Sequence, residues 1–214
     1  RVLLVDFDPQ GNATHGIGAH KVGFEKTVYD ILMRDENVDD VKVTLQMPPL
    51  DVLPSTIDLS GADVDMAQYE TGREQLLKRK LEAVRDQYDY IIIDCPPALG
   101  LLNTNALTAA DSVMIPVQCE YFALEGLTQL LSTIRLVQKL WNPRLSIEGV
   151  LLTMFDVRTK LSVEVQQEVR KYFKEKVYHC FIPRNVRLSE APSREQSIFE
   201  YDTRSEGARA YAQL

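Results

Sequence analysis

Short, continuously apolar runs alternate along the chain with longer stretches of helical period. The apolar runs are predicted strands, and they lie at residues 2–5, 50–53, 90–93, 112–117, 149–154 and 178–182. Strands that are apolar at successive positions, rather than at every second one, are typical of a parallel sheet that is covered on both faces. We therefore expect both faces of these strands to be buried.

Amphipathic helices are predicted between these strands, at residues 73–88, 121–140 and 161–175. In the second of them the leucines and other apolar residues follow i, i+3, i+4 spacing, as in a helix with one buried face. Alternation of strand and helix predicts an α/β fold with a doubly wound, mostly parallel sheet and helices on both faces. No repeat, low-complexity tract or flexible linker interrupts the pattern, so residues 1–214 are interpreted as a single domain.

Composition narrows the class of protein without identifying it. The chain has 214 residues, of which 45% are hydrophobic and 26% are charged, and this suits one globular core. Its apolar runs are too short to span a bilayer. The three cysteines show no CxxC spacing, so a disulfide framework or a structural zinc site is not expected, and a reducing cytosol suits the chain.

Charge is distributed unevenly. The formal net charge is −7, which argues against attraction of the whole surface to nucleic acid. Residues 156–194, however, hold 9 basic and 5 acidic side chains, a local net charge of +4. This excess indicates either a basic binding face or an ordinary solvated helix surface.

Two predicted strands end in aspartates that suit phosphate chemistry. Asp6 and Asp8 follow the first strand, and Asp94 ends the strand at 90–93. Carboxylates at such positions can hold a cation or orient a water that attacks a phosphate, and an apolar strand ending in aspartate is the Walker B arrangement. Pro9 and Gly11 would shape the turn, although the same residues also suit a simple strand-terminating turn.

A third group of polar residues follows the last two predicted strands. The segment 151–159 contains Met154, Asp156 and Arg158, and the segment 182–193 begins with Ile-Pro-Arg-Asn. Backbone and amide groups of such a turn can contact a base edge, with Met154 and Pro183 as apolar contacts. Alternatively, these residues only form the turns and loops that follow the strands.

Taken together, these motifs resemble the ParA/Soj chromosome- and plasmid-partitioning ATPases, a branch of the MinD-like deviant Walker P-loop proteins. The resemblance covers essentially the whole chain. The segments that carry it are VLLVDFDPQGNAT, YDYIIIDCPPALGLLNTNAL, DSVMIPVQCEYFALEGL, EGVLLTMFDVRT, IPRNVRLSEAPS and YDTRSEGARAYAQL. The family's KGGVGKT-type Walker A loop does not occur in the chain, so we expect a domain that lacks the first strand, P-loop and first helix, and a fragment that is inactive by itself.

The resemblance implies ATP and Mg²⁺ as cofactors and assigns roles to individual residues. Asp8 would position the attacking water, Asp94 would be the Walker B carboxylate, and Asp6 would lie near the Mg²⁺ shell. Adenine contacts would come from Asp156 and from Pro183, Arg184, Asn185 and Val186.

The resemblance also implies how the complete protein works. An ATP-bound homodimer would bind duplex DNA without sequence preference, and a ParB/Spo0J-like partner would stimulate hydrolysis and release, in the cytoplasm and on the nucleoid. The basic excess in residues 156–194 predicts Arg158 and Arg187, on loops at strand ends, as the principal DNA contacts.

Two other functions remain as alternatives. A MinD-like positioning ATPase would bind the membrane through a basic amphipathic C-terminal helix, which the sequence does not show, and no membrane association is expected. A non-catalytic binding module is the second alternative, if the P-loop is truly absent.

Overall fold

The computed structural model describes residues 1–46, 49–120 and 123–214. Contacts divide the chain into two compact units. The N-terminal unit comprises residues 1–110 and 137–143, and the C-terminal unit comprises residues 111–136 and 144–214. The interpretation of the whole chain as a single domain stays a prediction.

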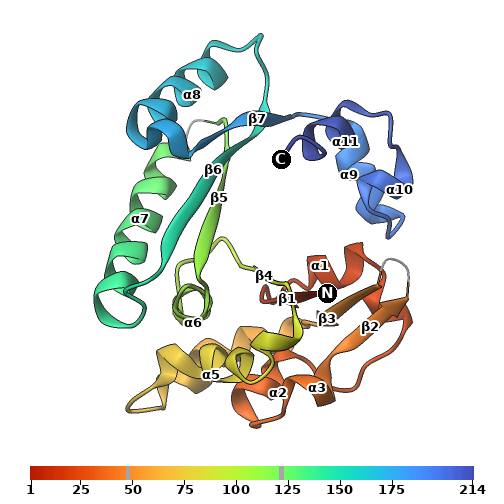
Figure 1. The fold of residues 1–214 in the computed structure, drawn as a ribbon, viewed down its shortest axis with the longest axis vertical. Coiled ribbons are helices and arrows are strands. Elements are labelled where there is room, and N and C mark those ends of the chain that lie inside the picture. The colour runs from red at the N-terminus through yellow and green to blue at the C-terminus, as the bar shows by residue number, and fades with distance from the viewer. Residues whose placement is uncertain (47–48, 121–122) are drawn as a thin grey trace. The chain divides into compact units, whose positions relative to one another are not determined.

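The N-terminal unit is built on a four-stranded sheet in the order β2-β3-β1-β4 (Figure 1). The strands are β1 (Val2–Asp6), β2 (Val43–Gln46), β3 (Pro49–Leu53) and β4 (Tyr90–Asp94), and only β2 runs antiparallel to its neighbour. The helices are α1 (Asn12–Gly16), α2 (Val28–Met33), α3 (Val38–Val41), α4 (Ala62–Ala67), α5 (Leu76–Glu82) and α6 (Leu101–Ala109). Leu3 and Val5 of β1 lie in one hydrophobic core with buried side chains of α2 to α6. This core fixes the strand ends that carry the aspartates.

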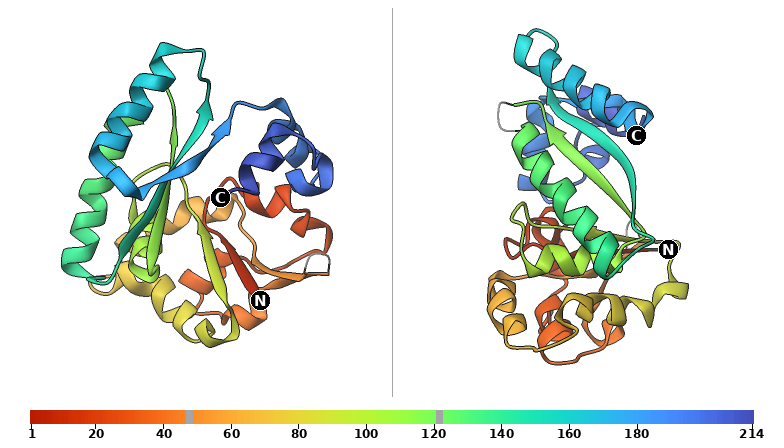
Figure 2. Two further views of the ribbon diagram at one scale, coloured as in Figure 1. Left: turned by 45° about the horizontal axis from the view of Figure 1, so that its top comes forward. Right: turned by 90° about the vertical axis from the view of Figure 1, so that its left-hand side faces the viewer.

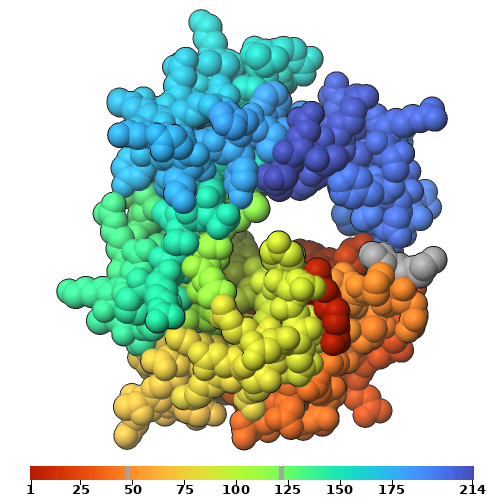
Figure 3. All heavy atoms as spheres, in the orientation of Figure 1, coloured from red at the N-terminus to blue at the C-terminus, as the bar shows by residue number. Residues whose placement is uncertain are grey.

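The C-terminal unit is built on a parallel sheet in the order β5-β6-β7. Its strands are β5 (Ser112–Gln118), β6 (Ser146–Phe155) and β7 (Val177–Pro183), and its long helices are α7 (Ala123–Leu140) and α8 (Lys160–Phe173). Helix α8 packs along β6 and β7 (Figure 2). The short helices α9 (Val186–Ser193), α10 (Ile198–Tyr201) and α11 (Glu206–Tyr211) contact one another and form the dark blue surface in Figure 3.

The six predicted strands are all present, and each observed strand is one to four residues longer than the prediction. The predicted helices at 121–140 and 161–175 correspond to α7 and α8, although residues 121 and 122 lie outside the described residues. The helix predicted at 73–88 is wrong in length, because α5 is short and is flanked by 3₁₀ turns at Arg73–Gln75 and Arg85–Gln87. The start of α5 is fixed by tertiary structure, since the Leu77 amide donates to Asn105 Oδ1 at 3.2 Å.

The expectation that both faces of every strand are buried is wrong for β4 and β5. Tyr90 is 70% exposed and Ile92 is 54% exposed, whereas Ile91 and Ile93 pack against the core. Met114 of β5 is also exposed. Among the described strands, β4 pairs only with β1 and β5 pairs only with β6, so each is the last strand of its sheet. Their apolar character alone could not indicate this position.

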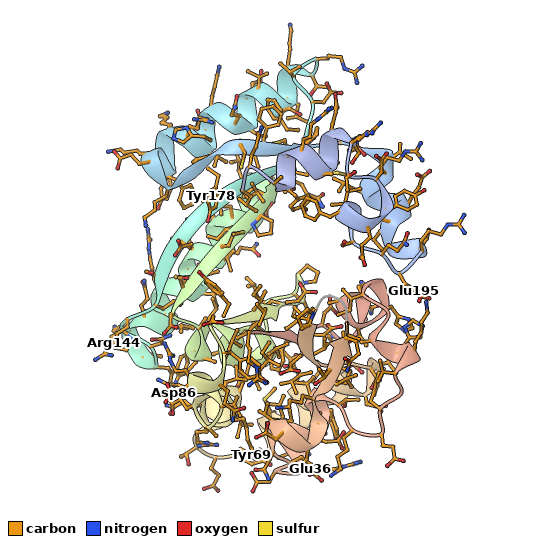
Figure 4. The ribbon with its side chains drawn as sticks, turned by 45° about the vertical axis from the view of Figure 1, so that its right-hand side comes forward. Glu36, Tyr69, Asp86, Arg144, Tyr178 and Glu195 are labelled. Atoms are coloured by element: carbon orange, nitrogen blue, oxygen red, sulfur yellow. The ribbon has the colours of Figure 1, made fainter. Side chains whose placement is uncertain are left out.

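A close contact between strands explains one glycine of β6. A Cβ on Gly149 would lie 2.5 Å from Cε2 of Tyr178, which is labelled in Figure 4. Gly149 pairs with Met114 where the register of β5 and β6 shifts. Only a residue without a side chain leaves room for the tyrosine ring here.

No helix in the described part of the chain is long and apolar enough to cross a membrane. The last described helix, α11, packs against β7, and its Ala208 and Ala210 are buried.

A buried carboxylate in the N-terminal sheet, away from the strand ends that carry Asp6 and Asp94, accepts hydrogen bonds from three other segments. Asp51 of β3 is 6% exposed and accepts hydrogen bonds from Thr44 Oγ1 at 2.6 Å, Tyr88 Oη at 2.8 Å and Arg1 Nη2 at 3.0 Å. Burial alone would raise the pKa of Asp51, but these donors outweigh it and hold the pKa below the usual value. The ionised form therefore stabilises the folded state.

Asp51→Asn should lower the free energy of unfolding by about 2 kcal/mol at pH 7, because the amide cannot accept all three hydrogen bonds. Since the folded-state pKa of Asp51 is depressed, its contribution is complete above about pH 5 and is lost as the pH falls below about 4 through the folded pKa. The loss should therefore shrink on acidification. Denaturant unfolding at pH 7 and pH 3 measures the loss of unfolding free energy, with the exposed Asp86→Asn as control. An equal difference at pH 7 and pH 3 would contradict the assignment.

Candidate functional site

Three carboxylates lie at the carboxyl ends of two neighbouring strands of the N-terminal unit. Asp6 ends β1 and Asp94 ends β4, and the two are partners in the parallel register. The Phe7 amide donates to the Asp94 carbonyl at 2.8 Å, so the chain leaves β1 beside β4. Asp8 follows Phe7 directly. The structure therefore brings together the aspartates that the sequence singled out.

The electrostatics of this cluster favour a cation. Desolvation by the surrounding protein raises the pKa of Asp94, and the charges of Asp6 and Asp8 raise it further, although part of the Asp94 side chain is exposed. A divalent cation would relieve this repulsion and favour the ionised form. No group of three or more potential metal ligands occurs among the described side chains. The neighbouring carboxylates of Asp8 and Asp94 suit Mg²⁺, which binds through one or two carboxylates and completes its shell with water and phosphate oxygens.

Asp6 differs from the other two because it is fully buried and engaged in hydrogen bonds. Its Oδ1 accepts from the Asp8 amide at 3.3 Å. Its Oδ2 accepts from the Thr14 amide at 2.7 Å and from Thr14 Oγ1 at 2.6 Å. Asp8, which is half-buried, and Asp94 are therefore the carboxylates open to a ligand, whereas Asp6 holds the chain that carries Asp8.

The turn after β1 has a defined geometry. Asp8 Oδ1 accepts a hydrogen bond from the Gln10 amide at 2.9 Å, and the Gly11 amide donates to the Asp8 carbonyl at 3.0 Å. Gly11 has φ +65°, a conformation that glycine adopts without a steric penalty. The sequence interpretation of Gly11 as a turn residue is consistent with this.

The loop after β4 is held by residues that the sequence did not indicate. Asn103 Nδ2 donates to the Pro96 carbonyl at 2.9 Å and to the Ala98 carbonyl. Asp63 Oδ1 accepts from the Leu102 amide at 3.1 Å and so caps α6. These contacts fix the segment between Asp94 and α6.

A second set of candidate residues lies at the ends of β6 and β7 in the C-terminal unit. Phe155 and Pro183 are register partners, which places Asp156 beside Arg184. Met154 has φ +52°, which is uncommon for a residue with a side chain and is seen at functional sites. Asn185 caps α9, because its Oδ1 accepts from the Arg187 amide at 2.9 Å.

The predicted DNA contacts are both exposed, and both are paired with carboxylates. Arg158 Nε and Nη2 donate to Asp156 at 2.9 and 2.7 Å. These bonds and that of the Arg158 amide lower the pKa of Asp156 to about 2, so the ion pair persists at neutral pH. Arg187 Nη1 donates to Glu190 at 2.8 Å. The placement of Arg187 on a loop is wrong, since it lies in the first turn of α9.

Because Cys95 and Cys119 follow apolar strands, both would be expected to be small buried residues, and only one of them is. Cys119 at the end of β5 is buried, whereas Cys95 is exposed. Cys95 directly follows β4, whose residues Tyr90 and Ile92 are themselves exposed at the end of the sheet. Its position in the sequence after an apolar strand therefore did not predict burial.

Several known proteins are similar to this chain in sequence and in fold. The family described as "AAA domain" matches residues 1–147. The sporulation initiation inhibitor protein Soj of Bacillus subtilis is 61% identical over the whole chain, which covers 84% of that protein. The chromosome partitioning protein ParA of Caulobacter vibrioides is 49% identical, again over the whole chain and 80% of that protein.

The chain belongs to the ParA/Soj family of chromosome-partitioning ATPases. A solved structure from Mycobacterium smegmatis, named cobyrinic acid a,c-diamide synthase and bound to an ATP analogue and magnesium, has the same fold. Its TM-score is 0.83 at 37% identity, over 99% of this chain and 78% of that one. The fold and the family expected from the motifs are thus confirmed.

Within this ParA/Soj chain, the residues that sequence analysis missed are those that hold the functional loops. Thr14, Asp63 and Asn103 each bond to a segment that carries or adjoins a candidate aspartate. None of them shares a helix or strand with Asp6 or Asp94, so no helical or strand period relates them. Only the tertiary contacts identify them.

Asn103→Leu should loosen the loop between Asp94 and α6, because the leucine has a similar size but cannot donate to the two loop carbonyls. We expect amide hydrogen exchange at Leu102 and Thr104, whose amides donate to Asp63 and to the Gly100 carbonyl where the loop enters α6, to accelerate at least about tenfold, equivalent to about 1.4 kcal/mol of lost protection. Thr104→Val is the matched control, since the Thr104 hydroxyl bonds only to the Gly100 carbonyl of its own helical turn. Unchanged exchange in the Asn103 variant would refute this role.

Proposed function

We propose that a protein in which this ParA/Soj chain is joined to a Walker A segment hydrolyses ATP with Mg²⁺ at the aspartate cluster and couples hydrolysis to reversible binding of duplex DNA. The observation that carries the proposal is the placement of two accessible carboxylates, Asp94 at the end of β4 and Asp8 just beyond the end of the adjacent β1, in a chain 61% identical to Soj. ParA-type partitioning is the function of the family. The residue roles and the partners below are inferences from this geometry and from the resemblance.

The two accessible aspartates have different tasks. Asp94, at the rigid end of β4, would hold Mg²⁺ or its water shell. Asp8, in the turn beyond β1, would orient the water that attacks the γ-phosphate. When bound, Mg²⁺ neutralises the charge of the phosphates and ATP supplies the phosphoanhydride bond. Asp6 is a metal neighbour in this proposal rather than a direct ligand, because its oxygens already accept three hydrogen bonds.

The C-terminal unit would contribute adenine recognition through its own strand ends. Asp156, Pro183, Arg184, Asn185 and Val186 are the proposed contacts. Val186 is strongly exposed, as an apolar contact for a base must be before binding. Arg184 is bonded to Glu120 at 2.8 Å, which limits its freedom in this unit.

DNA binding would use Arg158 and Arg187 on the same unit, in an ATP-dependent homodimer that doubles the basic surface. A guanidinium has five N–H donors, and the ion pairs of Arg158 with Asp156 and of Arg187 with Glu190 and Asp202 engage only some of them. A ParB/Spo0J-like protein would be the partner that stimulates hydrolysis and release, and the protein would be nucleoid-associated.

Asp8→Ala should lower kcat for ATP hydrolysis at least about 100-fold and leave nucleotide affinity within about threefold, because it removes water orientation rather than binding. The assay uses a form of the protein that carries a family-type Walker A segment ahead of Arg1. ATP-bound dimer should accumulate, as measured by light scattering.

Two further variants calibrate this result. Asp94→Ala should weaken Mg²⁺-dependent nucleotide binding itself, as measured by titration. Asp86→Ala, an exposed aspartate on the same unit (Figure 4), should change neither property. Wild-type turnover in Asp8→Ala would exclude the proposed role of Asp8.

Arg158→Glu and Arg187→Glu should each weaken ATP-dependent DNA binding at least about tenfold without changing dimer formation. Each lost phosphate contact should also reduce the slope of log affinity against log salt by about 0.9. Fluorescence anisotropy over a salt series measures both quantities. The exposed Lys139→Glu carries the same change in charge outside residues 156–194 and serves as control. If all three variants lose the same DNA affinity, the effect comes from net charge alone and the proposed contacts are wrong.

A further inference from the structure

A single buried hydroxyl links the turn that carries Asp8 to two different strands. Thr14 is 1% exposed. Its Oγ1 donates to Asp6 Oδ2 at 2.6 Å, and the same oxygen accepts from the Ser55 amide at 3.0 Å. Asp6 ends β1, and Ser55 lies just beyond the end of β3. The Thr14 hydroxyl therefore donates a hydrogen bond at the end of β1 and accepts one just beyond the end of β3.

The other end of the same turn also contacts Ser55. A Cβ on Gly11 would lie 3.0 Å from the Ser55 carbonyl oxygen, so the turn passes against this backbone with no room for a side chain. Gly11 and Thr14 thus hold opposite ends of one short segment on a single residue of the neighbouring strand connection. We call these contacts of Asp6, Gly11, Thr14 and Ser55 the Thr14 clasp.

The clasp anchors the turn to the sheet, whereas the bonds of Asp8 with the Gln10 and Gly11 amides lie within the turn itself. Helix α1 has five residues, too few to be stable without tertiary contacts. The bond from the Thr14 hydroxyl to the Asp6 carboxylate is short and charge-assisted, and such bonds are about twice as strong as neutral ones. The same carboxylate also accepts from the Asp8 amide, so the clasp and Asp8 share one anchor.

We propose that Thr14 is a positioning residue for ATP hydrolysis: through Asp6 and Ser55, it holds the turn in which Asp8 orients the attacking water. The inference rests on the proposed role of Asp8. Thr14 itself is buried, and its hydroxyl is engaged by Asp6 and Ser55 rather than open to a ligand. Its effect on the reaction is indirect, through the position of the Asp8 carboxylate.

Thr14→Val tests the proposal, because valine has the same shape but can neither donate to Asp6 nor accept from Ser55. In the protein carrying a Walker A segment, kcat at saturating ATP should fall at least about tenfold, since displacement of a catalytic group by about 1 Å can cost 100-fold. KM and the affinity for Mg²⁺-nucleotide should stay within about twofold. Thr14→Ser keeps the hydroxyl and should restore kcat to within about threefold of wild type.

Thr44→Val controls for a merely structural effect. The Thr44 hydroxyl also donates to an aspartate of low exposure, Asp51, at 2.6 Å, but near the opposite end of the strands. This variant should lose stability without losing kcat when both are assayed well below their melting temperatures. If Thr44→Val lowers kcat as much as Thr14→Val, the clasp has no special link to the reaction and the proposal is wrong.

Two further outcomes distinguish a failure of the Thr14 proposal from a failure of the proposed role of Asp8. Wild-type kcat in Thr14→Val, together with an inactive Asp8→Ala, would overturn the clasp and leave the role of Asp8 intact. An active Asp8→Ala would overturn both. If Thr14→Val does not fold, Gly11→Ala perturbs the clasp from its other end and should show the same fall in kcat at nearly constant KM. Full kcat in folded Gly11→Ala would then refute the proposal.

Discussion

The buried carboxylate of Asp6 is the constraint on which the N-terminal site depends. A fully buried carboxylate is stable only when its oxygens are satisfied, and here the donors are the Asp8 amide and the amide and hydroxyl of Thr14. The requirement to satisfy Asp6 therefore determines the path of the chain after β1. Because that path contains Asp8, burial of one aspartate determines where another is presented. The motif is a unit in which one carboxylate is structural and the other is free to act.

Asp94, the other accessible carboxylate of the cluster, is held in place by different contacts. It sits at the end of β4, and the loop beyond it is held by Asn103 and by the Asp63 cap on α6. The site thus combines a rigid strand end with two loops whose backbone groups are satisfied by buried side chains. Such an arrangement suits chemistry on a phosphate, in which positioning and charge contribute most of the rate.

The C-terminal unit shows how local pairing changes the meaning of a charge pattern. Residues 156–194 have a basic excess, yet Arg158 and Arg187 each lie within 2.8 Å of a carboxylate oxygen. Binding of a polyanion there has to compete with these ion pairs. Exposed pairs contribute little stability, so exchange of a carboxylate for a phosphate has a small energetic cost. The pairing lowers non-specific attraction without removing the donors.

The sequence by itself determined the family, six of the strands, the two long helices α7 and α8 and the aspartates at the strand ends, because periodicity and motif residues are local properties of the chain. It did not determine that β4 and β5 end their sheets, that α5 is short, or that Arg187 lies in a helix. Nor did it indicate Thr14, Asn103 or Asp63. These features depend on contacts between segments far apart in sequence, such as that of Asn105 with Leu77 or Thr14 with Ser55. Only the tertiary structure decides which buried polar group meets which partner, since each must find its donor or acceptor wherever the packed chain places one.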